Sequence, residues 1–174
     1  QRPHHTWRAN NCGEAISGSV TRVLASDLNT LSNFLAQNFQ YETGSFQDFQ
    51  DLTPAKRYLL RTDYNLTNAS KISFRYNQLD SSSANNLSTS SSAGIGRTLG
   101  GNAGGLHFAS TNYTILENIK SGIGEWNTVI GNSLSNNLIV GLTSNDESRG
   151  DVGELFPFVD ILQGGTSYMS FGTE

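Results

Sequence analysis

The stretch 58–80, YLLRTDYNLTNASKISFRYNQLD, alternates between two kinds of side chain on both sides of a central turn. Every second residue forms a row that is apolar or aromatic except for Thr62: Tyr58, Leu60, Tyr64 and Leu66, then Ile72, Phe74 and Tyr76. The other row is polar except for Leu59 and Leu79: Arg61, Asp63 and Asn65, then Lys71, Ser73, Arg75 and Asn77. Because successive side chains of a strand point to opposite faces, this pattern predicts a β-hairpin of strands 57–66 and 71–80 with one apolar and one charged face.

Three further segments carry regular patterns. The stretch 25–39, ASDLNTLSNFLAQNF, places Leu28, Leu31 and Leu35 on one stripe and predicts a short amphipathic helix with Ser26 as its N-cap. The stretch 113–131 predicts a long strand whose apolar side chains change parity at an expected bulge near 122–125, and 136–147 alternates with period two and predicts a further strand. The segment 81–110 is rich in Ser, Asn and Gly, so we expect a loop there, and a second long loop at about 146–165.

The connections between the expected strands alternate between short turns and long loops. Outer-membrane β-barrels show this alternation, because their periplasmic turns are short and their extracellular loops are long. In such a barrel the apolar row contacts lipid, the charged row lines a wet lumen, and Tyr58, Tyr64, Tyr76 and Trp126 are candidates for aromatic girdles. A half-buried strand in a soluble antiparallel sheet shows the same alternation, so periodicity alone leaves both interpretations open.

The composition argues against several classes of protein. The net charge is -4 and no Lys/Arg run is present, so we expect no nucleic-acid partner. No stretch approaches the roughly 18 apolar residues that a membrane-spanning helix needs, and the first residues lack the apolar region of a signal peptide. Neither end carries a capping or terminal feature, so we expect a fragment of a longer protein.

The segment KRYLLRTDYNLTNASKISFRYN resembles a hairpin of TonB-dependent outer-membrane transporters of the Oar-like type, which are common in Bacteroidota. The shared features are Arg61 and Asp63, two residues apart on the first strand, and the aromatic residues on both sides of Arg75. The preceding DLNTLSNFLAQNFQYETGSFQDF is similar to a helix-bearing extracellular loop, and NSLSNNLIVGLTSNDESRG with FPFVDI is similar to the next turn, strand and loop. The resemblance covers residues 20–174 and rests on the order and spacing of individually loose motifs.

The resemblance implies an all-β fold, namely a partial antiparallel transmembrane β-barrel with long extracellular loops and one short helix. The chain would supply about four to six strands of a barrel of about 22. Residues 1–56 would form an N-terminal segment and helix-bearing extracellular loop, and 57–174 the barrel strands with extracellular loops 81–112 and 146–165. An open sheet edge in hydrocarbon leaves backbone groups unsatisfied, so the neighbouring strands must come from outside the given sequence or from another chain.

The resemblance also implies binding and import of a substrate across the outer membrane of a Gram-negative bacterium. The implied partners are membrane lipid, the remaining barrel strands and plug of the parent protein, and the TonB complex. A surface lipoprotein or another outer-membrane protein is a further candidate. The plug, TonB box and signal peptide of that family do not occur in this sequence.

Substrate selectivity in this interpretation belongs to the loops 81–112 and 146–165. Their candidate substrate or partner contacts are polar and aromatic side chains: Arg97, His107, Phe108, Phe156 and Phe158. The alternative function is a soluble β-rich binding module or adhesin that recognises glycan or peptide through the same loops. A protein that is released from membranes only by detergent would favour the barrel.

Enzymatic and metal chemistry find little support in the sequence. The histidines lie in expected loops without a nucleophile motif or paired carboxylates, so we expect no enzyme. His4 and His5 with Cys12 lack zinc-type spacing. We expect no cofactor beyond a weak calcium candidate in the loop 146–154, where oxygen ligands cluster without EF-hand spacing: Asp146, Glu147, Asp151 and Glu154.

Overall fold

The computed structural model describes residues 7–48, 52–90 and 96–173. It is mostly β, with 55% strand and one short α-helix among the residues described, which confirms the all-β class. The chain folds as two compact units. The sheet unit is formed by Thr53–Ser82 and Leu116–Ser148, and the core unit by the described parts of Gln1–Leu52, Ser83–Ile115 and Arg149–Glu174. The boundary expected between 56 and 57 lies near the start of the sheet unit, but the chain leaves and re-enters that unit afterwards.

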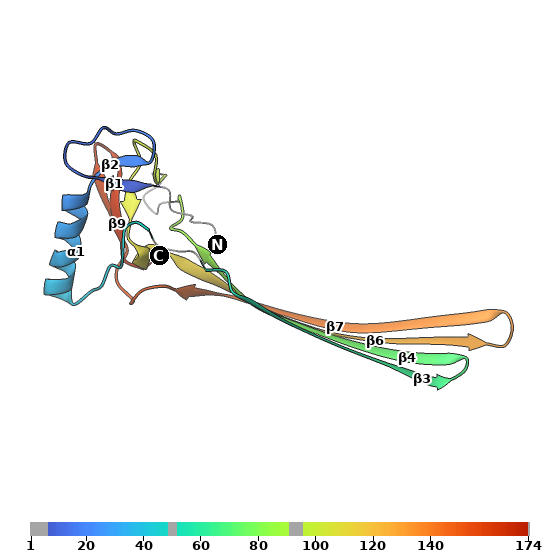
Figure 1. Ribbon diagram of the computed structural model, residues 1–174. Helices are drawn as coiled ribbons and strands as arrows, with labels where there is room; N and C mark the ends of the chain where they lie inside the picture. The colour runs from blue at the N-terminus through green and yellow to red at the C-terminus, as the bar shows by residue number, and fades with distance from the viewer. Residues whose placement is uncertain (1–6, 49–51, 91–95, 174) are drawn as a thin grey trace. The chain divides into compact units, whose positions relative to one another are not determined.

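The sheet unit consists of long strands in the order β3-β4-β6-β7, which lie side by side in Figure 1. Their bounds are β3 (Ala55–Thr67), β4 (Ser70–Asn85), β6 (Tyr113–Ile130) and β7 (Leu134–Asp151), of which residues 83–85, 113–115 and 149–151 belong to the core unit. β3 and β4 pair antiparallel, with Tyr64 opposite Ile72 and Leu60 opposite Tyr76, so the predicted hairpin is confirmed. The sheet is open, since in the described part of the chain no strand pairs with the outer edge of β3 or of β7.

The core unit combines short strands with the helix. β1 (Arg8–Asn10) pairs in parallel with β2 (Val20–Leu24), and β2 leads directly into α1 (Ala25–Phe39). A second sheet has the order β5-β9-β8, in which β5 (Leu106–His107) is parallel and β8 (Val159–Gln163) antiparallel to β9 (Thr166–Phe171). The 3-10 turn η1 (Ala109–Thr111) follows β5. Buried side chains of β1, β2, α1, β5 and β9, with Tyr41 and Phe108, form one hydrophobic core: Ala9, Val23, Leu28, Leu35, Tyr41, Leu106, Phe108, Tyr168, Met169 and Phe171.

The helix α1 occupies the predicted residues and buries Leu28 and Leu35. Ser26 is not its N-cap, because β2 runs into the helix without an intervening turn. Leu24 therefore takes the N-cap position, with no side-chain hydrogen bond, and the Ser26 hydroxyl donates to Asp27 instead. At the other end Gln40 adopts a left-handed conformation with φ 55° and its N–H donates to the Ala36 carbonyl.

The segments expected as unstructured loops are partly regular and packed. β4 continues to Asn85 and β7 to Asp151, and β5, η1 and β8 all lie inside the two expected loops. Leu106 and Phe108 are fully buried in the core unit although Ser and Gly dominate the sequence around them. Burial of such large apolar side chains offsets the entropy cost of ordering a Ser/Gly-rich chain, which local composition does not reveal.

Candidate functional site: a sheet with two unlike faces

One face of the sheet unit is apolar and exposed. In the β3–β4 register Thr62 lies opposite Phe74, and the aromatic and aliphatic pairs on either side share that face. The large side chains of this face in β3 and β4 are at least 40% exposed, apart from the half-buried Tyr76. They are Tyr58, Leu60, Tyr64, Leu66, Ile72 and Phe74. Ordinary soluble sheets bury such a row against a second layer, so this face is the feature of the unit that requires an explanation.

The strands β6 and β7 continue the same apolar face. A Cβ placed on Gly122 would lie 3.9 Å from the Phe74 ring, so position 122 is on the Phe74 side and Ile123 on the other. A Cβ on Gly141 would lie 3.5 Å from Ile123, which puts position 141 on the opposite face and Val140 on the Phe74 side. Alternation adds three more exposed side chains to the apolar face: Trp126, Leu138 and Leu142.

The apolar face has a defined height. In β3 it runs from Tyr58 to Leu66, eight steps of about 3.4 Å or about 27 Å along the strand. At the end of the band away from the β3–β4 turn the same face turns polar, because Gln78 of β4 lies opposite Tyr58 and Asp80 opposite Lys56. There Gln78 donates to Asp80, and Asn118 on β6 donates to the other oxygen of the same carboxylate. At the end of the band next to the β3–β4 turn, the Trp126 indole donates to the Ser70 hydroxyl over 2.8 Å. The face is therefore a bounded band with hydrogen-bonded aromatic residues at its margins.

The opposite face carries paired charges at the same height. Arg61 donates two hydrogen bonds, of 2.9 and 3.1 Å, to the carboxylate of Asp63, which also pairs with Lys71 at 3.2 Å. Arg75 pairs with Glu125 across the β4–β6 boundary at 3.5 Å. These side chains are partly exposed, between 21% and 54%. The predicted charged face is confirmed for Arg61, Asp63 and Arg75 as a property of the sheet.

Glu125 connects three strands of the charged face. Its Oε1 atom accepts hydrogen bonds from Asn127 at 2.8 Å and from Asn137 on β7 at 3.4 Å, while Oε2 accepts from Arg75. The sequence interpretation missed Glu125, although it has the same parity as Ile115, Ile119 and Ile123 of β6. Only the β4–β6 pairing shows that this parity coincides with that of Arg75.

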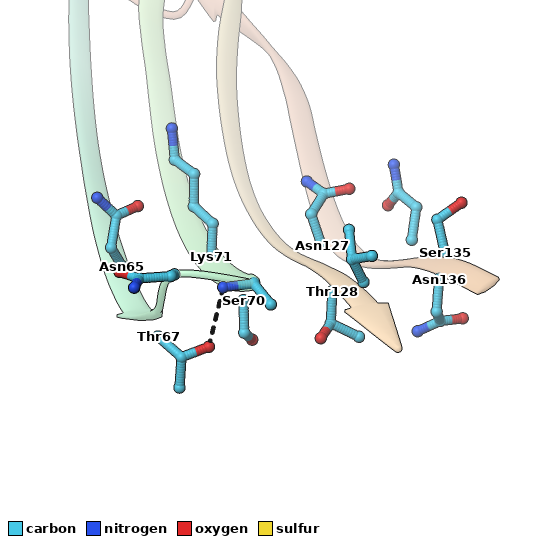
Figure 2. Close-up of a pocket in the computed structure, with 12 residues that line it drawn as sticks. Asn65, Thr67, Ser70, Lys71, Asn127, Thr128, Ser135 and Asn136 are labelled. Atoms are coloured by element: carbon cyan, nitrogen blue, oxygen red, sulfur yellow. Dashed lines mark hydrogen bonds between the residues drawn. The ribbon is translucent and has the colours of Figure 1, made fainter. Parts of the chain in front are cut away.

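A polar depression of 680 Å³ lies at the turn end of the sheet unit (Figure 2). Asn65, Lys71 and Asn127 point to one side of the strands, and Thr67 and Thr128 to the other. The Thr67 hydroxyl accepts a hydrogen bond from the Ala69 N–H and holds the β3–β4 turn. Amides and hydroxyls dominate the lining, which is suited to water and polar solutes rather than to apolar ligands.

The five predicted contact residues all lie in the core unit, where the structure distributes them over two groups. Arg97, 8% exposed, donates to Asp160 over 2.7 Å and to the carbonyls of Ser88 and Ser90, and its guanidinium lies 4.4 Å from the centre of the Phe158 ring. Asp160 also accepts from Ser170 at 2.6 Å, so this cluster ties three segments of the unit together. Asp160 was not foreseen because it lies 63 positions from Arg97.

The other predicted contacts are core residues. His107 and Phe108 are 2% and 0% exposed, and Phe108 packs edge-on against Phe46. Phe156 is half-buried and stacks on Tyr41 with ring centres 4.2 Å apart. In this arrangement Arg97, His107 and Phe108 stabilise the core unit and present little surface to a ligand. Phe156 and Phe158 retain some exposed surface.

The candidate metal ligands do not form a cluster. Asp146, Glu147 and Asp151 lie in β7 rather than in a loop, and alternation along a strand points neighbouring carboxylates to opposite faces. Among the residues described, no group of three or more His, Cys, Asp or Glu side chains is placed to hold a metal ion. Cys12 is exposed, and His4 and His5 lie outside the described residues.

Two ionisable groups of the core unit are perturbed by their partners. Hydrogen bonds from Arg8, at 2.8 and 3.0 Å, hold the pKa of Glu14 below its usual value. Burial raises the pKa of Tyr168, whose hydroxyl donates to Asp27 at 2.8 Å and accepts from the Leu24 N–H at 3.0 Å. The Arg8–Glu14 pair is local, whereas the Tyr168–Asp27 contact joins segments 141 positions apart, and both serve the stability of the unit.

No described helix has the length and apolar character needed to cross a membrane.

No family model, curated protein or solved structure matches this chain.

Proposed function

We propose that the sheet unit is a section of the wall of a β-barrel in the outer membrane of a Gram-negative bacterium. The barrel would belong to a TonB-dependent protein that binds and imports a substrate. The observation that carries the proposal is the apolar band of exposed side chains across all four strands, backed by ion pairs at the same height. A barrel wall is apolar towards lipid and polar towards its lumen, with an outward band about 25 Å tall.

The margins of the band support a membrane position. Trp126 combines a large apolar ring with a hydrogen bond to Ser70, and the Tyr76 hydroxyl donates to Gln78 at the opposite margin. Aromatic residues with one polar atom concentrate at both membrane–water interfaces for this reason. The ion pairs of Arg61 and Arg75 would be hydrated in a lumen and would cost far more in lipid.

The edges of the sheet define what else the barrel needs. β3 and β7 expose backbone N–H and C=O groups, and each unsatisfied group in hydrocarbon costs several kcal/mol. Further strands must therefore pair with both edges in the assembled barrel. The remaining strands of the parent protein are the proposed partners, together with its plug, the TonB complex and an outer-membrane partner protein.

The core unit favours a second candidate function. It has its own hydrophobic core, which a soluble binding module or adhesin for glycan or peptide would also need. In the import interpretation this unit gathers the expected extracellular segments and is the proposed surface for substrate or partner contact. The adhesin interpretation would require a second layer of protein, rather than lipid, over the apolar band.

Site-directed labelling tests the proposal directly. In a Cys12→Ser background, single cysteines replace Val140 on the apolar face and Thr143 on the charged face of β7, and each is labelled with an environment-sensitive fluorophore in native membranes. We expect a blue-shifted emission that lipid-borne quenchers suppress at position 140, and emission quenched by aqueous iodide at position 143. Equal behaviour at both positions, or recovery of the protein in aqueous buffer without detergent, would contradict the barrel.

A further inference from the structure

Two arginines stand directly opposite each other on the charged face. Arg61 of β3 and Arg75 of β4 are partners in the antiparallel register, and both belong to the face opposite Phe74. Directly opposed residues have Cβ atoms about 5 Å apart, and like charges in this position destabilise a sheet. A sheet that places two guanidinium groups side by side needs negative charge close to both of them.

The protein supplies less negative charge than the pair requires. Asp63 is shared between Arg61 and Lys71. Glu125 is shared between Arg75 and the amides of Asn127 and Asn137, and its contact with Arg75 is a single bond at the long distance of 3.5 Å. The group therefore contains three cations and two carboxylates and keeps one positive charge in excess.

The two arginines also retain donors for a ligand. A guanidinium carries five N–H groups in a planar fork that matches the oxygens of a phosphate or carboxylate. The contacts within the sheet use Nε and Nη2 of Arg61 and Nη2 of Arg75. Both side chains are about half exposed, so the remaining N–H groups are accessible from the charged face.

We propose that Arg61 and Arg75 together bind an oxyanion, a phosphate or carboxylate group of a small soluble solute, on the charged face of the sheet. The anion bridges the two guanidinium groups, supplies the missing negative charge and relieves their repulsion. If the sheet lines an import barrel, this site assigns an anionic class to the solutes that pass it. The binding itself requires only the sheet, so its test is independent of the labelling at positions 140 and 143.

The test measures binding of inorganic phosphate to the purified intact protein at constant ionic strength and neutral pH, by calorimetry. We expect Arg61→Gln and Arg75→Gln each to weaken phosphate binding about tenfold, because each removes charge-assisted hydrogen bonds. Arg57→Gln is the matched control, since Arg57 lies on the same face of β3 but opposite Leu79, and it should bind phosphate like the unaltered protein. Succinate replaces phosphate in a parallel titration and identifies carboxylate as the preferred group if it binds more tightly.

A second variant guards against loss of binding through misfolding. Glu125→Gln removes the carboxylate that competes for Arg75, so phosphate should bind more tightly, by about threefold to tenfold. A gain of affinity cannot result from damage to the fold. Equal affinity in the Arg61, Arg75 and Arg57 variants, or no gain in Glu125→Gln, would overturn the proposal and leave Asp63 and Glu125 as the sufficient counter-charges of the pair.

Discussion

Replacing Phe74 with arginine tests the apolar band at its middle. Phe74 lies opposite Thr62, the central residue of the run from Tyr58 to Leu66, so a membrane would place position 74 near its midplane. Arginine on the lipid-facing side of a barrel costs about 2–4 kcal/mol at the midplane and about 0–1 kcal/mol near the interface. Phe74→Arg should then lower the folding equilibrium constant about 30- to 700-fold.

Two control variants separate lipid from a protein layer. Tyr58→Arg places the same charge at the margin of the band, and Asn77→Arg places it on the exposed charged face of the same hairpin, opposite Leu59. We expect both to cost less than about 1 kcal/mol. Ser73 is an unsuitable control, although its position on the polar face suggests tolerance, because it is only 5% exposed among the charged side chains around it.

The assay is reversible denaturant unfolding of the intact protein in lipid vesicles, followed by tryptophan fluorescence. A graded cost that is large at position 74, small at position 58 and small at position 77 matches a lipid boundary. Equal costs at 74 and 77 would show that the two faces are wrongly assigned. Equally large costs at 74 and 58 would indicate a uniform protein contact over the band, and the barrel proposal would fail.

Four further variants test the core unit. Arg97→Met leaves the partly buried Asp160 without its cation and should destabilise the unit by about 3 kcal/mol in denaturant unfolding, whereas Arg97→Met combined with Asp160→Asn should recover part of the loss. Tyr168→Phe should lose about 1 kcal/mol of unfolding free energy. The raised pKa of Tyr168 favours the neutral hydroxyl in the folded state, so this group lowers the unfolding free energy above about pH 10. The variant should lack that contribution. The lowered pKa of Glu14 stabilises the fold above about pH 4.3, and this stabilisation is lost as the pH falls through the pKa of the folded state. Glu14→Gln should abolish this pH-dependent stabilisation. Carboxyl NMR titration and acid unfolding can check both expectations.

The sequence predicts elements whose interactions are close along the chain. The β3–β4 hairpin follows from alternation, because its turn is short and a slip of one residue would exchange its two faces. The helix α1 follows from Leu28, Leu31 and Leu35 at helical spacing, and it ends where predicted but begins at Ala25, before the predicted cap Ser26. In both cases the pattern that determines the structure lies within one or two adjacent elements.

The core unit was not predicted because its contacts are distant in sequence. Leu106 pairs with Met169, and Arg97 with Asp160, so neither partner indicates the other by spacing. Ser- and Gly-rich composition indicates a loop only when no distant apolar partner is available, and Phe108 has several in the core. Three of the five predicted contact residues, Arg97, His107 and Phe108, have side chains that suit ligand binding, but the fold uses these side chains for packing.

The two faces of the sheet unit have their strongest contrast at one height. Arg61 and Arg75 lie on one side of the same hairpin segment whose other side carries Thr62 and Phe74, so hydrated charge and exposed apolar surface are separated by a single layer of backbone. A soluble core can cover the apolar face, but it would need a protein layer over side chains that are mostly at least 40% exposed, while the charges opposite stay in water. A bilayer covers this face without a matching protein surface. For this reason the pairing of an exposed apolar face with an ion-paired face, more than hydrophobicity alone, supports a membrane wall over a half-buried soluble sheet.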